Sequence, residues 1–522
     1  MKSWHVHITR QRTKALHKVV VLFVALLAWS GVASSQAPVW IPIFTPPQFN
    51  VGVALLLTDG SIMVQQNKTP NWWKLTPDNF GFYRSGTWSP LASMPAGYKP
   101  LFFAAAVLKD GRVIVEGGEY NNGIKDWTNL GAIYDPVANS WTPVPAPPGW
   151  SKIGDAPSVV LSDGTFMLGN CCDNPAQAAL LDEATLTWTV LTKASGFAGK
   201  FDRNNEEGWN LLPNGDVLTV DTYTGVPYNS VGMHSEIYNT GTKKWTSAGS
   251  TQVQLWDSKG ACGGPAGATH EIGPAVLRPD GTVFATGSNT CMPGTAGHTA
   301  IYNSITNSWT ASLDIPGVND AADAPAAILP DGNVLLDTNP RWGVSPSTLY
   351  EFAFDGSGWV SIPQPTGLNP SNTEGARMLA TPDGTILLAH VNTPEIWFYV
   401  PAGTYQPQWQ PTITSCPANV TVGSTYTVSG TQFNGLSQGA AFGDDAQSAT
   451  NYPIVRIQNN ISLEYHFARS HDFSTMAVAT GNLPTSTQFD VLPGTSSGPS
   501  TLQVIANGIP SAPCPTTVHP QP

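Results

Sequence analysis

Acidic residues recur at one position of an internal repeat. In five successive repeats, an acid stands six places before the apolar residue that closes the first predicted strand. These acids are Asp155, Glu206, Glu271, Asp323 and Glu374. Equivalent strands of a closed repeat array face a common axis. The pattern therefore predicts five carboxylates at one level around the mouth of a central channel.

Five like charges repel one another, and the repulsion should raise some of their pKa values. The candidate partners are Arg203, Arg377 and Arg469. Three interpretations of the five acids stay open. They accept hydrogen bonds from backbone N–H groups and so join neighbouring repeats, they bind a cation, or two of them form a catalytic acid/base pair. Ligands that are all oxygen favour calcium over a transition metal.

The strand that follows each first strand should end at the same mouth, because the two form a hairpin. Glu116, Asp221, Asp337 and His390 fall near that end. These residues are expected to add titratable groups to the region around the five acids.

A second polar cluster lies near the C-terminus, at residues 464–472, and contains His466 and His471. Two interpretations are open. The segment is either a polar hairpin tip or a loop that reaches into the channel with His471. In the second case His471 joins the five acids as a ligand-binding candidate.

The repeat that positions these residues is an apolar run, a DG or NG turn and a second apolar run. The turns begin at seven residues, separated by 51 to 53 residues except for one interval of 66: Asp59, Asp110, Asp163, Asn214, Asp280, Asp331 and Asp383. DG and NG are strong hairpin signals, and we expect positive φ at both central positions. A period near 50 with four strands per unit is typical of kelch repeats.

A tryptophan marks the same period, 25 to 31 residues past each turn: Trp88, Trp141, Trp188, Trp245, Trp309, Trp359 and Trp409. We expect these rings to pack between neighbouring units rather than to bind sugar. Seven units predict an all-β chain with a seven-bladed kelch-type β-propeller over residues 38–410. Whether 37–43 supplies an outer strand to the last blade stays open. Residues 411–522 predict a small Ig-like β-sandwich.

The first 35 residues carry five basic residues, no acid and an apolar run of 14, Val19–Val32, which predicts a signal peptide. A secreted or periplasmic protein without stable membrane insertion is expected. The whole chain has a formal charge of −12, and the part after the leader is more acidic still. This charge disfavours nucleic acid as a partner. A monomer is expected.

All six cysteines follow the leader, and an even number in an exported chain favours disulfides. Cys416 and Cys514 bracket the C-terminal region and are expected to pair. Cys262 with Cys291 is the second expected bridge. Cys171 and Cys172 are adjacent, and either pair with each other or elsewhere.

The seven hairpins, the tryptophans and the C-terminal phrases Val455–Ile457, Ser470–Asp472 and Gly498–Ser511 resemble the galactose oxidase family over the whole mature chain. The resemblance implies a propeller followed by an Ig-like domain, and copper bound by a histidine at the position of His471. The family's copper site also uses a Tyr-His pair where this chain has Glu374-Gly375, and a cysteine cross-linked to a tyrosine. Copper is therefore not expected, and the resemblance implies shared architecture rather than shared chemistry.

Three functions stay open. The first is binding of an extracellular carbohydrate or another small polar ligand at the acidic mouth, with or without turnover. The second is a galactose oxidase-like oxidoreductase. The third is a purely structural or protein-interaction propeller.

Overall fold

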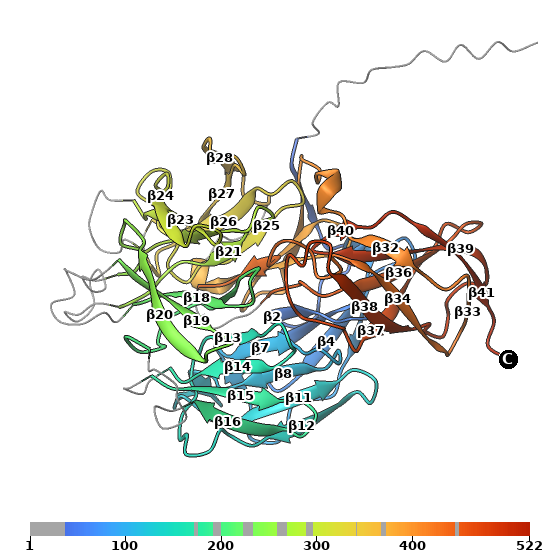
Figure 1. The fold of residues 1–522 in the computed structure, drawn as a ribbon, viewed down its shortest axis with the longest axis horizontal. Helices are drawn as coiled ribbons and strands as arrows, with labels where there is room; N and C mark the ends of the chain where they lie inside the picture. Colours follow the sequence, from blue (N-terminus) through green and yellow to red (C-terminus); the bar gives the residue numbers. More distant parts are fainter. Residues whose placement is uncertain are drawn as a thin grey trace, which may run out of the picture. The chain divides into compact units, whose positions relative to one another are not determined.

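The protein is described by a computed structural model that covers residues 37–522, except 172–175, 192–199, 223–232, 258–268, 289–295, 341, 367–371 and 444–447. Residues 37–522 form one compact unit dominated by antiparallel strands (Figure 1). The all-β prediction is confirmed. The predicted leader lies outside the described residues. Within the described part, none of the helices could cross a membrane, being too short and insufficiently apolar.

Seven antiparallel sheets share one arrangement of four strands and account for most of the described strands; the fourth strand of the last sheet is the N-terminal one, and the sixth sheet carries a fifth strand. The first three comprise β2 (Val51–Leu56), β3 (Ile62–Gln66), β4 (Trp72–Thr76) and β5 (Thr87–Pro90); β7 (Ala104–Val107), β8 (Val113–Glu116), β11 (Gly131–Asp135) and β12 (Ser140–Val144); and β13 (Ser158–Val160), β14 (Phe166–Gly169), β15 (Ala178–Asp182) and β16 (Thr187–Leu191). A small added sheet, β6 (Pro100–Leu101), β9 (Tyr120–Asn121) and β10 (Ile124–Lys125), accompanies the second.

The remaining four sheets follow in chain order. They comprise β17 (Asn210–Leu211), β18 (Val217–Val220), β19 (His234–Asn239) and β20 (Lys244–Ser250); β21 (Ala275–Leu277), β22 (Thr282–Thr286), β23 (Thr299–Asn303) and β24 (Ser308–Ala311); β25 (Ala326–Ile328), β26 (Val334–Thr338), β27 (Thr348–Phe352) and β28 (Trp359–Ile362); and β29 (Ala376–Ala380), β30 (Ile386–His390), β31 (Ile396–Val400) and β1 (Val39–Pro42).

The hairpin between the first two strands of each sheet differs from the expected turn. In the first sheet, Gly60 has φ of 74° and its N–H donates to Leu57 O, while Asp59 is not among the residues with positive φ. The loop is thus a three-residue turn with glycine in the left-handed position, and the Asp59 carboxylate accepts the Ser61 N–H at 3.0 Å. The prediction of positive φ at both central positions is wrong. Only the glycine has positive φ, while the aspartate stabilises the turn by accepting a backbone hydrogen bond with its carboxylate.

The N-terminal strand completes the last sheet. β1 pairs with β31, and Trp40 lies opposite Tyr399, as Trp141 lies opposite Tyr134 in the second sheet. The expected marker of the last unit, Trp409, instead lies in a 3-10 turn, Pro407–Trp409. Within residues 37–43, Val39–Pro42 therefore supplies the outer strand of the last sheet.

The closing tryptophans join neighbouring sheets, as expected. The Trp141 indole N–H donates to Ala92 O, beyond the last strand of the first sheet, at 2.9 Å. Trp40 does the same to Pro363 O, beyond the sixth sheet, at 2.9 Å. Trp88 of the first sheet donates to Thr45 O, beyond β1 of the last sheet, at 2.8 Å. The first and last sheets are therefore linked in the same way as consecutive ones.

The C-terminal region forms one further set of strands: β32 (Thr412–Ser415), β33 (Asn419–Thr421), β34 (Thr425–Thr431), β36 (Ile454–Asn459), β37 (Tyr465–His471), β38 (Pro484–Asp490), β39 (Gly498–Ala506), β40 (Ile509–Pro510) and β41 (Cys514–His519). β37 pairs with β36 through one half and with β38 through the other. One short strand of the C-terminal region, β35 (Ala440–Ala441), does not pair with these strands. It pairs with β25 and forms the fifth strand of the sixth sheet.

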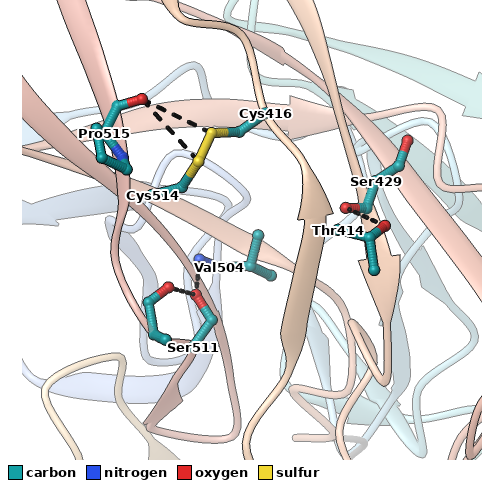
Figure 2. The surroundings of a disulfide bond; sticks show 8 residues. Thr414, Cys416, Ser429, Val504, Ser511, Cys514 and Pro515 are labelled. Carbon is teal, nitrogen blue, oxygen red and sulfur yellow. Dashed lines mark hydrogen bonds between the residues drawn. A yellow bond between two sulfur atoms is a disulfide. The ribbon is translucent and has the colours of Figure 1, made fainter.

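Cys416 and Cys514 form the expected disulfide, which ties the segment after β32 to the start of β41 (Figure 2). The bond closes a loop with a sequence separation of 98 residues. Cys171 is also disulfide-bonded. Cys172, Cys262 and Cys291 lie outside the described residues, so the pairing expected for Cys262 and Cys291 stays a prediction.

Candidate functional site

All five repeat-related acids line one cavity of about 610 Å³, called here the acidic cavity. A sixth acid, Glu119, lines it as well. The structure therefore brings together the carboxylates that the repeat placed at one level. Their role in binding stays a prediction.

Each acid lies just before the first strand of its sheet. Glu206 precedes β17 and Asp323 precedes β25, while Glu374 lies in a 3-10 turn directly before β29. Glu206 has φ of 56° and Asp323 has φ of 46°, a region that side chains other than glycine rarely adopt. Phe102, the equivalent residue of the second repeat, has φ of 53°. This unusual backbone recurs at the entrance to the sheets, and such conformations concentrate at functional sites.

Three of the carboxylates lie closest together. Oxygen atoms of Glu206, Glu271 and Asp323 all lie within 4.8 Å of one another. The Asn205 amide donates to Glu206 Oε1 at 2.7 Å, and the Trp342 indole N–H donates to Asp323 Oδ2 at 2.9 Å. An all-oxygen group of this kind suits calcium among the biological cations.

Aromatic and basic side chains form the rest of the wall. The aromatic residues are Phe102, Tyr120, Trp127, Trp342 and Phe442, and the bases are Lys125 and Arg203. Lys125 pairs with Glu119 and lies 5.1 Å from the centre of the Trp127 ring. The cavity thus offers acceptors, a few cations and flat apolar faces, a combination common in sites for polar organic ligands.

The three arginines proposed to balance the acids have different surroundings. Arg203 lines the acidic cavity. Arg377 donates from Nη1 to the carbonyl oxygens of Glu374 and Ala376, both at 2.7 Å. Arg469 instead pairs with Asp490 at 2.5 Å within the C-terminal strands. The prediction that Arg469 balances the five acids is therefore wrong, because the pairing of β37 with β38 places Arg469 opposite Asp490.

His471 does not belong to the residues that line the acidic cavity. Its ring nitrogens contact Asp472 at 2.8 Å and Asp490 at 3.2 Å. It lies beside the hairpin turn of the second sheet, where an added Cβ on Gly111 would be 3.6 Å from the His471 Cβ. Hairpin turns and strand entrances are opposite ends of a sheet, so the prediction that His471 joins the five acids is wrong.

A different C-terminal segment reaches the acidic cavity. β35 adds to the sixth sheet, with Ala441 opposite Ala326, and Phe442 then lines the cavity. At Gly443 an added Cβ would lie 2.9 Å from Ile272 O, so only glycine fits so close to that backbone. This segment was not anticipated from the sequence. Its run of small residues around a single phenylalanine was the available signal.

The residues near the ends of the second strands are deeply buried. Burial raises the pKa of Glu116 well above its usual range and raises that of Asp337 to about 7. Burial, together with the nearby Arg377, lowers the pKa of His390 to about 4. These groups are therefore held mainly in their neutral forms at neutral pH, Asp337 only in part.

Asp221 belongs to a separate buried cluster around Lys200. The Lys200 ammonium contacts Glu207 at 2.6 Å, Asp221 at 3.0 Å and Glu236 at 3.4 Å, and it also pairs with Asp202. Despite this cation, burial raises the pKa of Glu236 to about 8. Lys200 itself occupies the place where the acids could otherwise hold a metal ion.

A second cavity, of about 480 Å³, adjoins the acidic cavity and shares Phe102, Tyr120 and Glu374 with it. Two lysines, Lys68 and Lys99, line it together with asparagines from the first and last repeats. This basic cavity was not anticipated from the sequence, because neither lysine occupies the position where the repeat carries an acid.

The copper set implied by the family resemblance does not fit the described residues. The acidic cavity has Tyr120 but no histidine in its described lining, and His471 is held by two aspartates elsewhere. Glu374 and Gly375 stand where the family has its Tyr-His pair. No step of an oxidase reaction can be derived from these side chains.

Comparison with known proteins gives a partial match. No family model matches the chain. A Kelch-like protein of Aspergillus terreus, terF, is 24% identical to it over 272 residues. Both this relative and the all-β sheets fit a kelch-repeat β-propeller. The match covers 48% of this chain and 53% of the relative, so the chain spans about half the length of the curated protein it matches.

Proposed function

We propose that the chain is a secreted, seven-bladed kelch propeller that binds an extracellular carbohydrate in the acidic cavity. Residues 1–35 would be its signal peptide, 38–410 the propeller and 411–522 an Ig-like domain in a galactose oxidase-like arrangement. Seven sheets of the same kind, six of which donate a hydrogen bond from the closing tryptophan to the preceding sheet or the segment after it, support the closed ring of the propeller. The bifurcated pairing of β37 supports a two-sheet C-terminal domain.

The observation that carries the binding proposal is the convergence of five carboxylates from five repeats on one cavity with aromatic walls. Carboxylates accept hydrogen bonds from sugar hydroxyls, and aromatic faces bury the apolar faces of sugar rings. A cavity of about 610 Å³ lies in the range of small-molecule sites. A calcium ion at Glu206, Glu271 and Asp323 would neutralise part of the charge and offer a further contact to hydroxyl groups.

Binding can be tested with a panel of neutral and acidic oligosaccharides, followed by calorimetry on any sugar that binds. The double variant Glu271→Gln/Asp323→Asn should lose at least tenfold in affinity, because it removes two acceptors from the cavity. The matched control is Asp314→Asn/Asp472→Asn, whose side chains are 52% and 55% exposed outside the cavity. Equal affinities in both variants, or no binding by the unaltered protein, would contradict the proposal.

Metal content is a separate measurement. Elemental mass spectrometry of the purified protein should find about one calcium per chain, and the Glu271→Gln/Asp323→Asn variant should lose it. A protein that carries no calcium under saturating conditions would remove the ion from the proposal and leave direct binding by the carboxylates.

A further inference from the structure

The two adjoining cavities have opposite charge. The acidic cavity has six carboxylates against two basic side chains, whereas the basic cavity has Lys68, Lys99 and Arg377 against Glu374 alone. A basic compartment is unusual in a chain with 36 acidic and 24 basic residues. The shared residues Phe102, Tyr120 and Glu374 place the two cavities next to each other.

The two lysines are available to a ligand. Arg377 is already engaged, since its guanidinium donates to two carbonyl oxygens and lies against Phe442. Lys68 and Lys99, by contrast, form no ion pair with any carboxylate in the described part of the chain. An unpaired ammonium group beside a cavity attracts an anion and can form a charge-assisted hydrogen bond with it.

The backbone that carries Lys68 is fixed by buried contacts. Its neighbour Asn67 is 7% exposed and donates from Nδ2 to Asn392 Oδ1 at 2.8 Å. Thr69 N–H donates to Gln66 O, which places Lys68 at the third position of a tight turn with φ of 59°. Glycine or asparagine is favoured at such a position. A lysine there is costly for the fold, and such residues concentrate at binding sites.

Lys99 is anchored in a similar way. Asn121, which is 8% exposed, accepts the Lys99 N–H at 2.9 Å and donates to Gly97 O at 3.1 Å. Both lysines thus stand on ordered segments from two different repeats. Anchoring of this kind reduces the entropy lost when a ligand binds.

We infer that the basic cavity is a subsite for a singly charged anionic substituent of the bound sugar, either a uronate carboxylate or a sulfate ester. This inference rests on the proposed function and narrows its ligand class to acidic oligosaccharides. Each of these substituents carries one negative charge, and either lysine of the basic cavity can form a charge-assisted hydrogen bond with it. The uncharged rings of the ligand lie against the aromatic residues shared by the cavities.

The test compares three probes by calorimetry: digalacturonic acid, the same disaccharide reduced to hydroxymethyl groups, and the reduced disaccharide carrying one 6-sulfate. The unaltered protein should bind one or both charged probes at least tenfold more tightly than the neutral one. The charged probe with the higher affinity identifies the source of the anion. Lys68→Gln/Lys99→Gln should abolish this preference and leave affinity for the neutral disaccharide within about twofold.

The matched control is Lys243→Gln/Lys244→Gln, which removes the same charge from the end of the turn after β19 and the start of β20 and should keep the preference. Equal affinity of the unaltered protein for charged and neutral probes overturns the inference while the proposed function stands. Failure to bind any of the three probes overturns the inference. Failure against the wider oligosaccharide panel as well overturns the proposed function.

Discussion

The guanidinium carbon of Arg377 lies 4.0 Å from the centre of the Phe442 ring. Arg377 belongs to β29 of the last propeller sheet, and Phe442 follows β35 of the C-terminal region. The contact joins the two parts of the chain at the acidic cavity. Phe442 is 4% exposed and Arg377 is 5% exposed, so the contact is shielded from water, where a cation and an aromatic ring attract each other most strongly.

Phe442→Ala should lower the free energy of unfolding by about 3 kcal/mol, because it removes a buried aromatic ring and leaves a void beside Arg377. It should also weaken ligand binding, since the ring lines the acidic cavity. Urea denaturation followed by intrinsic fluorescence measures the first effect. Phe44→Ala is the control, because Phe44 is 61% exposed and should change stability by less than about 0.5 kcal/mol. Equal stability of the two variants would show that the segment does not pack as described.

Lys200→Met should destabilise the protein by about 3 to 5 kcal/mol. The variant leaves the acids of the Lys200 cluster buried without the cation that holds them together. Lys74→Met is the control, since Lys74 pairs with Asp59 at 3.5 Å and its side chain is 31% exposed. Such partly exposed pairs contribute about 1 kcal/mol or less. Thermal denaturation of the two variants should therefore separate them clearly, and similar midpoints would mean that Lys200 is not buried among these acids.

The repeat explains why part of the site could be predicted. A residue type that recurs at one register of equivalent hairpins must recur at one level in space, so Glu271 and Asp323 could be grouped without a structure. The same logic located the closing tryptophans in six sheets. It failed for the seventh, because Trp409 lies at the expected spacing while Trp40, from the opposite end of the chain, pairs with Tyr399.

The parts of the site outside the repeat were not predictable in this way. Phe442 enters through a short strand that pairs with β25, and nothing in the local sequence specifies that partner. One of the two interpretations of residues 464–472 put His471 in the channel, but the strand pairing of β37 with β38 holds it against Asp490. Lys68 lies in the turn after β3, and Lys99 directly precedes β6 of the small added sheet. Contacts that depend on pairing between distant segments need the three-dimensional structure.

The buried imidazole of His390 should make the protein sensitive to acid. The pKa of His390 is lowered to about 4 in the folded protein, from a usual value of about 6.5. As pH falls below 6.5 the unfolded chain takes up a proton that the folded protein takes up only near pH 4. The free energy of unfolding should therefore fall by about 3 kcal/mol across this window on account of His390 alone.

The variant His390→Gln has no titrating group at this position. Its free energy of unfolding, measured by urea denaturation, should therefore fall correspondingly less between pH 7.5 and pH 4.5. The control His298→Gln replaces a side chain that is 36% exposed and should keep the pH dependence of the unaltered protein. Parallel profiles for His390→Gln and the unaltered protein would mean that the folded state does not hold His390 in its neutral form.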